Sequence, residues 1–222
     1  MVKKTAVVKK LKLRIEEQFR TLRANIKFSS AEDAIKTIVV TSCLPSEGKS
    51  TVISNLASSM AKDGKSVIIL DCDLRKPSIH KKFSLSNYKG LTNILVERKN
   101  IEWVITGTQI PNVFVVPSGP IPPNPSELLS SKSFKEIINE LVDSFDLVLI
   151  DSPPVLYVSD AQILSALAQG TIIVTAYGKT EKKALVSAKE NIEKAGGKIL
   201  GVVINKIPDV YNEDYGYYYG ER

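Results

Sequence analysis

Short runs of Val, Ile and Leu recur along the chain and alternate with segments of helical periodicity. Each run is almost continuously hydrophobic, as expected for strands that are buried on both faces of a parallel sheet. Strands and helices that alternate in this way form right-handed β-α-β crossovers, with helices on both faces of the sheet. The sequence therefore predicts an α/β fold with a mostly parallel sheet. The expected strands are residues 37–42, 66–73, 113–118, 146–152, 171–177 and 199–205.

Two intervening segments carry helix signals, and a third argues against regular structure. Apolar residues from Val52 to Met60 share one face of a predicted helix, which Gly64 would end. Ser133 followed by Glu136 has the spacing of a capping box and predicts the start of another helix. Residues 116–129 hold five of the 11 prolines, so we expect a stiff surface loop there.

The chain of 222 residues is long enough for one domain with a full core, and it has no apolar run of membrane-spanning length. We expect a single domain over residues 1–222, with a basic N-terminal arm, 1–14, and a flexible tyrosine-rich tail, 209–222. The first residues lack the apolar block of a secretory signal, which favours a cytoplasmic location. Cys43 and Cys72 match no zinc spacing, and we expect both to be reduced.

The net charge of +6 comes from the N-terminal arm, because six basic residues precede the first acidic residue, Glu16. The rest of the chain is formally balanced, so the charge does not indicate a nucleic-acid-binding surface. The arm could contact an anionic membrane face or an acidic partner. A solvated, disordered terminus is the alternative.

The segment TSCLPSEGKST, residues 41–51, lies between a predicted strand and a predicted amphipathic helix. The unpaired N-H groups and the dipole at the start of such a helix favour a bound phosphate. Gly48 allows the main chain to approach phosphate oxygens, Lys49 can reach the β- and γ-phosphates, and the Ser50 hydroxyl is placed to bind Mg²⁺. Thr51 can add a contact further back along the phosphates. The segment therefore predicts a nucleotide site, with an ordinary helix start as the alternative.

This loop departs from the usual pattern G-x-x-x-x-G-K-[ST], because Cys43 stands at the first glycine position. The departure indicates a loop entry of different shape, as in deviant forms of the motif, which Pro45 would help to fix. Ser46 stands where a glycine would be easier to accommodate. We include Glu47 among the residues that contact the nucleotide.

Acidic residues end two of the predicted strands. Asp71 and Asp73 are two positions apart, so both can face one site, and Asp151 ends a second strand. In open α/β sheets ligands bind at the carboxyl ends of the strands, and carboxylates beside an apolar sheet need a cation or hydrogen bonds. We interpret Asp151 as a magnesium-binding acid and Asp71 or Asp73 as the acceptor of a proton from an attacking hydroxyl. Arg75 and Lys76 could then face phosphate charge. Capping of the next loop or helix is the alternative for these acids.

Four segments together resemble motifs of one family, the bacterial tyrosine kinases (BY-kinases) of capsular and extracellular polysaccharide synthesis. SCLPSEGKST resembles their Walker A motif, IILDCDLRKP their Walker A′ motif and LVLIDSPPV their Walker B motif, and SGPIPPNPSELL resembles a further segment typical of them. The resemblance implies a P-loop NTPase-like fold, ATP and Mg²⁺ as cofactors, and ATP-dependent protein-tyrosine kinase activity. The site residues that it implies are Lys49, Ser50 and Thr51 for the ATP phosphates, Asp71 and Asp73 for catalysis and Mg²⁺, and Asp151 for Mg²⁺.

The resemblance also implies partners. EQFRTLR is similar to the family's E-x-x-R-x-x-R helix, here Glu17, Arg20 and Arg23, which is associated with contacts between subunits in a ring. Asn205 and Lys206 resemble the adenine-contacting position of related deviant ATPases. Without a membrane span, the chain resembles the separate cytoplasmic subunits, which meet the membrane through a membrane-spanning activator, the polysaccharide co-polymerase. Protein substrates other than the chain itself are also possible.

The last twelve residues hold five of the eight tyrosines, interrupted by glycines and surrounded mostly by acidic residues. A packed core does not explain this composition, and the acidic neighbours disfavour nucleic acid. We therefore expect the tail to be the phosphate acceptor and to enter the active site of a neighbouring subunit, where added charge would loosen the ring. The predicted acceptors are Tyr211, Tyr215, Tyr217, Tyr218 and Tyr219.

Two other classes of protein share part of this pattern. A deviant-Walker ATPase of the partitioning or division-site type has the same loop and A′ acid, but it would release free phosphate and needs no tyrosine tail. A dinucleotide-binding oxidoreductase needs G-x-G-x-x-G after the first strand, and this sequence does not contain that motif.

Overall fold

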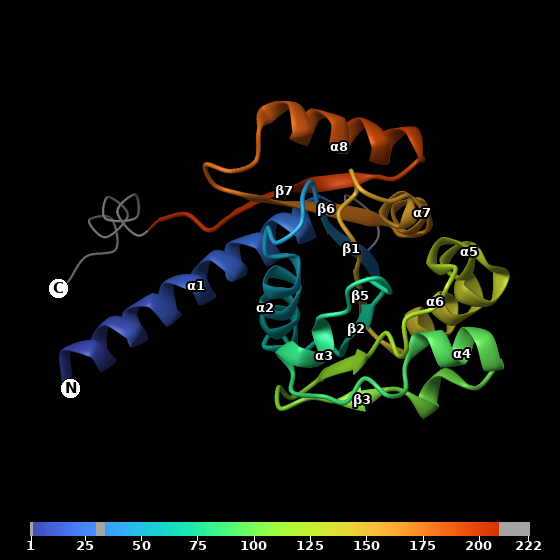
Figure 1. The fold of residues 1–222 in the computed structure, drawn as a ribbon. Helices are drawn as coiled ribbons and strands as arrows, with labels where there is room; N and C mark the ends of the chain where they lie inside the picture. The colour runs from blue at the N-terminus through green and yellow to red at the C-terminus, as the bar shows by residue number, and fades with distance from the viewer. Residues whose placement is uncertain (1, 30–33, 209–222) are drawn as a thin grey trace.

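The computed structural model describes residues 2–29 and 34–208, which form one seven-stranded sheet with helices on both of its faces (Figure 1). The strand order is β3-β4-β2-β5-β1-β6-β7, and every pairing is parallel except that of β3 with β4. The six predicted strands are confirmed, and β3 is a short addition at the edge. The strands are β1 Thr37–Ser42, β2 Val67–Asp71, β3 Thr106–Gly107, β4 Val113–Val116, β5 Leu147–Asp151, β6 Gly170–Ala176 and β7 Ile199–Asn205.

The helices form two layers around this sheet. Apolar side chains of α1, α2 and α3 pack on one face, and those of α4, α6, α7 and α8 pack on the other. The strand residues between these layers are fully buried in β1, β2, β5 and β6, which explains their unbroken hydrophobic runs. The helices are α1 Val2–Phe28, α2 Lys49–Ala61, α3 Ile79–Lys82, α4 Leu91–Glu97, the 3₁₀ helix η1 Ile101–Trp103, α5 Pro125–Ser130, α6 Lys132–Ser144, α7 Asp160–Leu167 and α8 Lys182–Lys194.

Three sequence expectations need correction. Residues 2–14 form the first half of α1 and are not the disordered terminus that we considered. Helix α6 begins two residues before the predicted start, because the Ser131 hydroxyl accepts a hydrogen bond from the amide of Phe134. The proline-rich segment contains α5, with Pro125 in its first turn, where the missing N-H costs nothing. The expected end of α2 is confirmed, because Gly64 adopts φ +87° just after the helix.

In the described residues, no helix is both long enough and apolar enough to cross a membrane.

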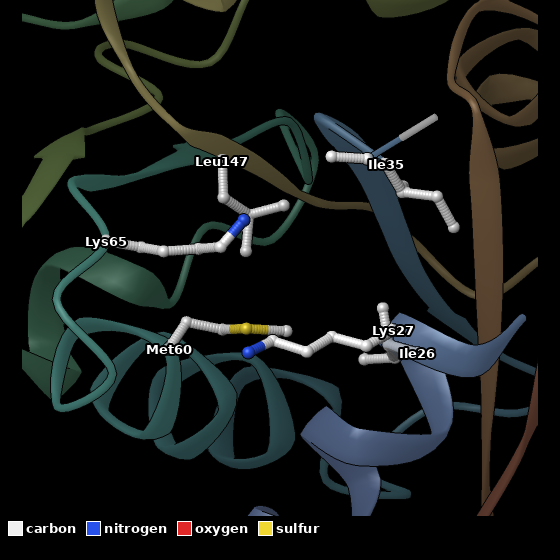
Figure 2. Close-up of a pocket in the computed structure, with 7 residues that line it drawn as sticks. Ile26, Lys27, Ile35, Met60, Lys65 and Leu147 are labelled. Carbon is white, nitrogen blue, oxygen red and sulfur yellow. The ribbon is translucent and has the colours of Figure 1, made fainter. Parts of the chain in front are cut away.

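A pocket of about 230 Å³ lies at the amino ends of the strands, where α1 and the end of α2 meet the start of β5 (Figure 2). The phosphate loop follows β1 at the opposite, carboxyl edge of the sheet, so this pocket is not the predicted nucleotide site. It is lined by Ile26, Lys27, Ala34, Ile35, Met60, Lys65 and Leu147.

Candidate active site

The predicted phosphate loop connects β1 to α2 and turns at two residues with positive φ. Gly48, which directly precedes α2, has φ +102°, and a Cβ atom there would lie 2.0 Å from the side-chain nitrogen of Asn205. Ser46 has φ +62°, a left-handed conformation that glycine adopts more easily, as the sequence suggested. Lys49 begins the helix and is buried. Gly48 is therefore needed both for its positive φ and for the close approach of the Asn205 side chain.

Neighbouring elements hold this loop in place. Glu47 is only 3% exposed, and its carboxylate accepts hydrogen bonds from the Leu44 amide, at 2.8 Å, and from the Thr180 hydroxyl. At the end of β7, the Asn205 amide donates to the Glu47 carbonyl at 2.9 Å and the Lys206 amine to the Ser46 carbonyl at 2.6 Å. All four bonds fix the path of the loop. In this structure Glu47, Asn205 and Lys206 thus contact the loop itself, and their predicted contacts with a nucleotide remain predictions.

The strand-end acids meet beside this loop. Asp71 and Asp151 are register partners on adjacent strands, and both are fully buried. One oxygen of Asp71, Oδ2, accepts bonds from the amides of Ser78 and Ile79, both at 3.0 Å. One oxygen of Asp151, Oδ2, accepts a bond from the Ser50 hydroxyl at 3.3 Å. The remaining oxygen of each carboxylate is buried without a hydrogen-bond partner among the described residues.

Asp73 lies just beyond the end of β2 and faces the same region. It is 7% exposed, and its carboxylate accepts a hydrogen bond from the amide of Lys76 at 3.0 Å. Electrostatic interactions link it to Lys49 and to both buried acids. The prediction that these three acids converge is therefore confirmed as geometry.

Burial dominates the electrostatics of these acids. Loss of hydration raises the pKa of Asp71 to about 7, against hydrogen bonds from Ile79 and Ser78 that lower it, and the charge of Asp73 raises it further. Burial, followed by the charge of Asp71, raises the pKa of Asp151 well above its ordinary value, while Lys49 lowers it. An ionised carboxylate is costly in such surroundings unless a cation lies beside it, so these acids favour the binding of a cation.

These observations test whether Mg²⁺ fits the site. The two partnerless carboxylate oxygens and the Ser50 hydroxyl are hard oxygen ligands, which Mg²⁺ prefers. Among the described residues, no three His, Cys, Asp or Glu side chains form a metal cage by themselves. This fits Mg²⁺, because the ion usually binds through one or two carboxylates together with phosphate oxygens and water.

The structure gives Arg75 a partner that the sequence did not identify. The Arg75 guanidinium makes two hydrogen bonds to Asp160, at 2.8 and 3.2 Å, and its expected contact with phosphate stays a prediction. Asp160, in the first turn of α7, is fully buried and also accepts a bond from the Ser126 hydroxyl at 2.5 Å. These contacts tie the segment after Asp73 to α5 and α7. The only signal for Asp160 in the sequence was an acidic residue at the start of a helix. That signal did not reveal that its partner is Arg75, 85 residues earlier in the chain.

The predicted subunit-contact residues lie on α1. Glu17 and Arg20 are exposed and form an ion pair at 2.8 Å. Arg23 instead ties α1 to α2, because its guanidinium donates to the Ser59 carbonyl at 2.7 Å and lies 3.4 Å from Asp63. The five predicted acceptor tyrosines, residues 211–219, lie outside the described residues. Cys43 and Cys72 are both buried and unbridged, as expected.

The parallel sheet with its phosphate loop defines a P-loop NTPase-like protein, and the AAA domain family matches residues 35–196. The tyrosine-protein kinase YwqD of Bacillus subtilis is 44% identical over 91% of this chain and 85% of its own length. The crystal structure of the chimerical protein CapA2B2 is 41% identical, with a TM-score of 0.83, and covers 86% of this chain and 84% of that chain. The chain therefore belongs to the family of bacterial tyrosine-protein kinases.

The rival ATPase class shares the fold. The structure of the septum site-determining protein MinD of Pyrococcus horikoshii, complexed with Mg-ADP, is 24% identical, with a TM-score of 0.65, and covers 81% of this chain and 76% of that chain. Identity at this level shows similarity of fold alone. The much higher identity to YwqD favours the kinase reading and confirms the resemblance stated from the sequence.

Proposed function

We propose that this kinase transfers the γ-phosphoryl group of ATP to the tail tyrosines of a neighbouring subunit and thereby regulates capsular or extracellular polysaccharide synthesis. One observation carries the proposal. Two fully buried carboxylates on adjacent strands each keep one partnerless oxygen, next to the Ser50 hydroxyl at the start of α2. A magnesium nucleotide on the phosphate loop would supply the charge that these oxygens lack.

Each residue of the site has a role in this reaction. Lys49 and the amides at the start of α2 would hold the β- and γ-phosphates, and Ser50, Asp71 and Asp151 would hold Mg²⁺. The bound ion would neutralise charge on the phosphoryl group being transferred. Asp71 or Asp73 would accept the tyrosine proton, and burial raises the pKa of both carboxylates above their ordinary values, which makes each a stronger proton acceptor.

The position of β7 supports the tail as acceptor. This strand ends at Asn205, beside the phosphate loop, so the chain leaves the sheet at the active-site edge. Residues 209–222, fully extended at about 3.4 Å per residue, would span up to about 48 Å, which is enough to reach an adjacent subunit. We propose a ring of subunits in contact through the α1 surface of Glu17 and Arg20, both of which are exposed.

We also propose that the protein acts at the membrane through a membrane-spanning activator of polysaccharide export. Six basic residues precede Glu16 in the sequence, and residues 2–14 form the first part of α1, whose N-terminal end lies at one end of the molecule (Figure 1). Such a cluster suits an anionic membrane face or an acidic partner next to it.

The test is a phosphorylation assay with ATP and Mg²⁺, read by anti-phosphotyrosine antibody and by mass spectrometry of the tail. Lys49→Met should abolish labelling, whereas Lys135→Met, at an exposed position of α6, should not. A variant with Phe at all five tail tyrosines should lose self-labelling but keep ATP binding. ATP hydrolysis without any phosphotyrosine would refute the proposal and favour the switch ATPase.

A further inference from the structure

The short helix α3 joins the A′ segment to the phosphate-loop helix at two points. At its start, the Ser78 hydroxyl lies 2.5 Å from the Ser50 hydroxyl. The Asp71 carboxylate accepts hydrogen bonds from the amides of Ser78 and Ile79. At its end, the Lys82 amine donates a hydrogen bond to the Thr51 hydroxyl at 2.9 Å. The helix is therefore anchored on predicted magnesium-binding residues, which gives Lys82 a defined place beside the phosphate loop.

The charge of Lys82 is not balanced by a carboxylate. In the part of the chain that the structure describes, the neutral Thr51 hydroxyl is the one hydrogen-bond partner of this amine. The other lysine of the site, Lys49, is buried and interacts electrostatically with Asp73 and Asp151. An exposed ammonium group with no counter-charge, at the rim of a phosphate site, is available to an anionic ligand.

The bond also orients Thr51. The Thr51 amide already donates to the Gly48 carbonyl at 3.0 Å, so only its hydroxyl can serve a ligand. Because that oxygen accepts from Lys82, its own proton is free to be donated elsewhere. From the sequence, Thr51 is expected to contact the phosphates further back than Lys49 and Ser50 do. The Lys82 amine, which is bonded to the Thr51 hydroxyl, would then lie near the α-phosphate.

We propose that Lys82 is a nucleotide-binding residue that acts with Thr51 on the α-phosphate of the bound nucleotide. The inference rests on the proposed nucleotide site but does not depend on which protein is phosphorylated. Lys82 would donate directly to a phosphate oxygen while it holds the Thr51 hydroxyl in place. Because ATP and ADP share the α-phosphate, the contact would serve both equally.

The test is the affinity of the full chain for ADP and for a slowly hydrolysed ATP analogue with Mg²⁺, measured by titration calorimetry. Lys82→Met should weaken both nucleotides by the same factor, about 3- to 10-fold, since the contact is charge-assisted but exposed. Lys82→Arg should retain much of the affinity. The matched control is Lys81→Met, because Lys81 is the adjacent exposed lysine and carries the same charge.

A double-mutant cycle separates this role from a purely structural one. Thr51→Val removes the hydroxyl and keeps the shape of the side chain, so Lys82→Met should cost less in that background than in the wild type. The melting temperature of the nucleotide-free protein should not change with Lys82→Met. Equal ADP affinity of the Lys81 and Lys82 variants, or a loss confined to the ATP analogue, would overturn the inference and leave the kinase proposal intact. If the wild-type chain does not bind ADP, both proposals fail.

Discussion

Replacement of Asp71 by Asn should stabilise the protein in the absence of metal and nucleotide while it abolishes phosphoryl transfer. An unfolded aspartate releases its proton near its ordinary pKa of 3.8, whereas burial keeps the proton on folded Asp71 up to a pKa of about 7. Between these values unfolding releases a proton, so rising pH favours the unfolded chain. The stability that Asp71 contributes is therefore complete below about pH 4 and is lost as the pH rises through 7.

The structure gives the size of this effect. The interval from 3.8 to about 7, at about 1.4 kcal/mol per pH unit, corresponds to about 4 kcal/mol at pH 8. An asparagine keeps an oxygen for the amides of Ser78 and Ile79, but its new amide group needs an acceptor, for which Asp151 on the neighbouring strand is suited. Desolvation of that amide reduces the gain, so we expect Asp71→Asn to add about 1–3 kcal/mol at pH 8 and almost nothing at pH 4.

The assay is urea unfolding followed by circular dichroism, in EDTA without nucleotide, at both pH values. Asp146→Asn is the control of opposite sign, because the amide and hydroxyl of Ser66 lower the pKa of this exposed carboxylate. Its replacement should destabilise the protein at pH 8. If Asp71→Asn unfolds at the same or lower urea concentration than the wild type at pH 8, the account of an uncompensated buried acid is wrong.

Three further predictions concern the same region. Asp160→Ala deprives Arg75 of a buried bidentate partner and should lower the free energy of unfolding in urea by about 1–3 kcal/mol, and an unchanged midpoint would contradict this. Gly48→Ala places a Cβ atom 2.0 Å from a side-chain nitrogen at the end of β7, so ADP affinity in calorimetry should fall at least about 10-fold. Gly64→Ala, also at positive φ but in open space, should leave ADP affinity unchanged. Binding of Mg-ADP at pH 6 should release protons from Asp71 and Asp151, seen as a dependence of the binding heat on the buffer, and this dependence should weaken above pH 8, where Asp71 is already ionised.

The sequence predicted the central strands and the phosphate loop because both depend on local signals. Buried parallel strands leave continuous hydrophobic runs, and the Gly48-Lys49-Ser50 sequence between a strand and a helix has few other uses. The two-residue strand β3 leaves no such signal. The start of α6 was misplaced because Ser131 and Ser133 lie close together at this end of the helix, and the spacing of a capping box does not show which hydroxyl reaches an amide.

The features of the site that the sequence did not predict depend on contacts between segments that are far apart in the chain. The sequence placed Arg75 next to the acids and therefore near phosphate, but the charge that holds it lies on α7. Thr180 and Lys82 were also missed, since a hydroxyl after a strand and a lysine in a short helix are common everywhere. The convergence of Asp71, Asp73 and Asp151 could be predicted, because the topology of a parallel sheet alone brings the strand ends together.

The bonds from the end of β7 to the phosphate loop have a mechanical consequence. Asn205 and Lys206 hold the carbonyls of Glu47 and Ser46, and the C-terminal segment begins three residues beyond Lys206. Tension on that segment therefore reaches the loop through a very short length of chain. In the proposed ring, a tail drawn into a neighbouring subunit would pull on the phosphate loop of its own subunit, so delivery of tyrosine to one active site would weaken nucleotide binding in the subunit that supplies the tail.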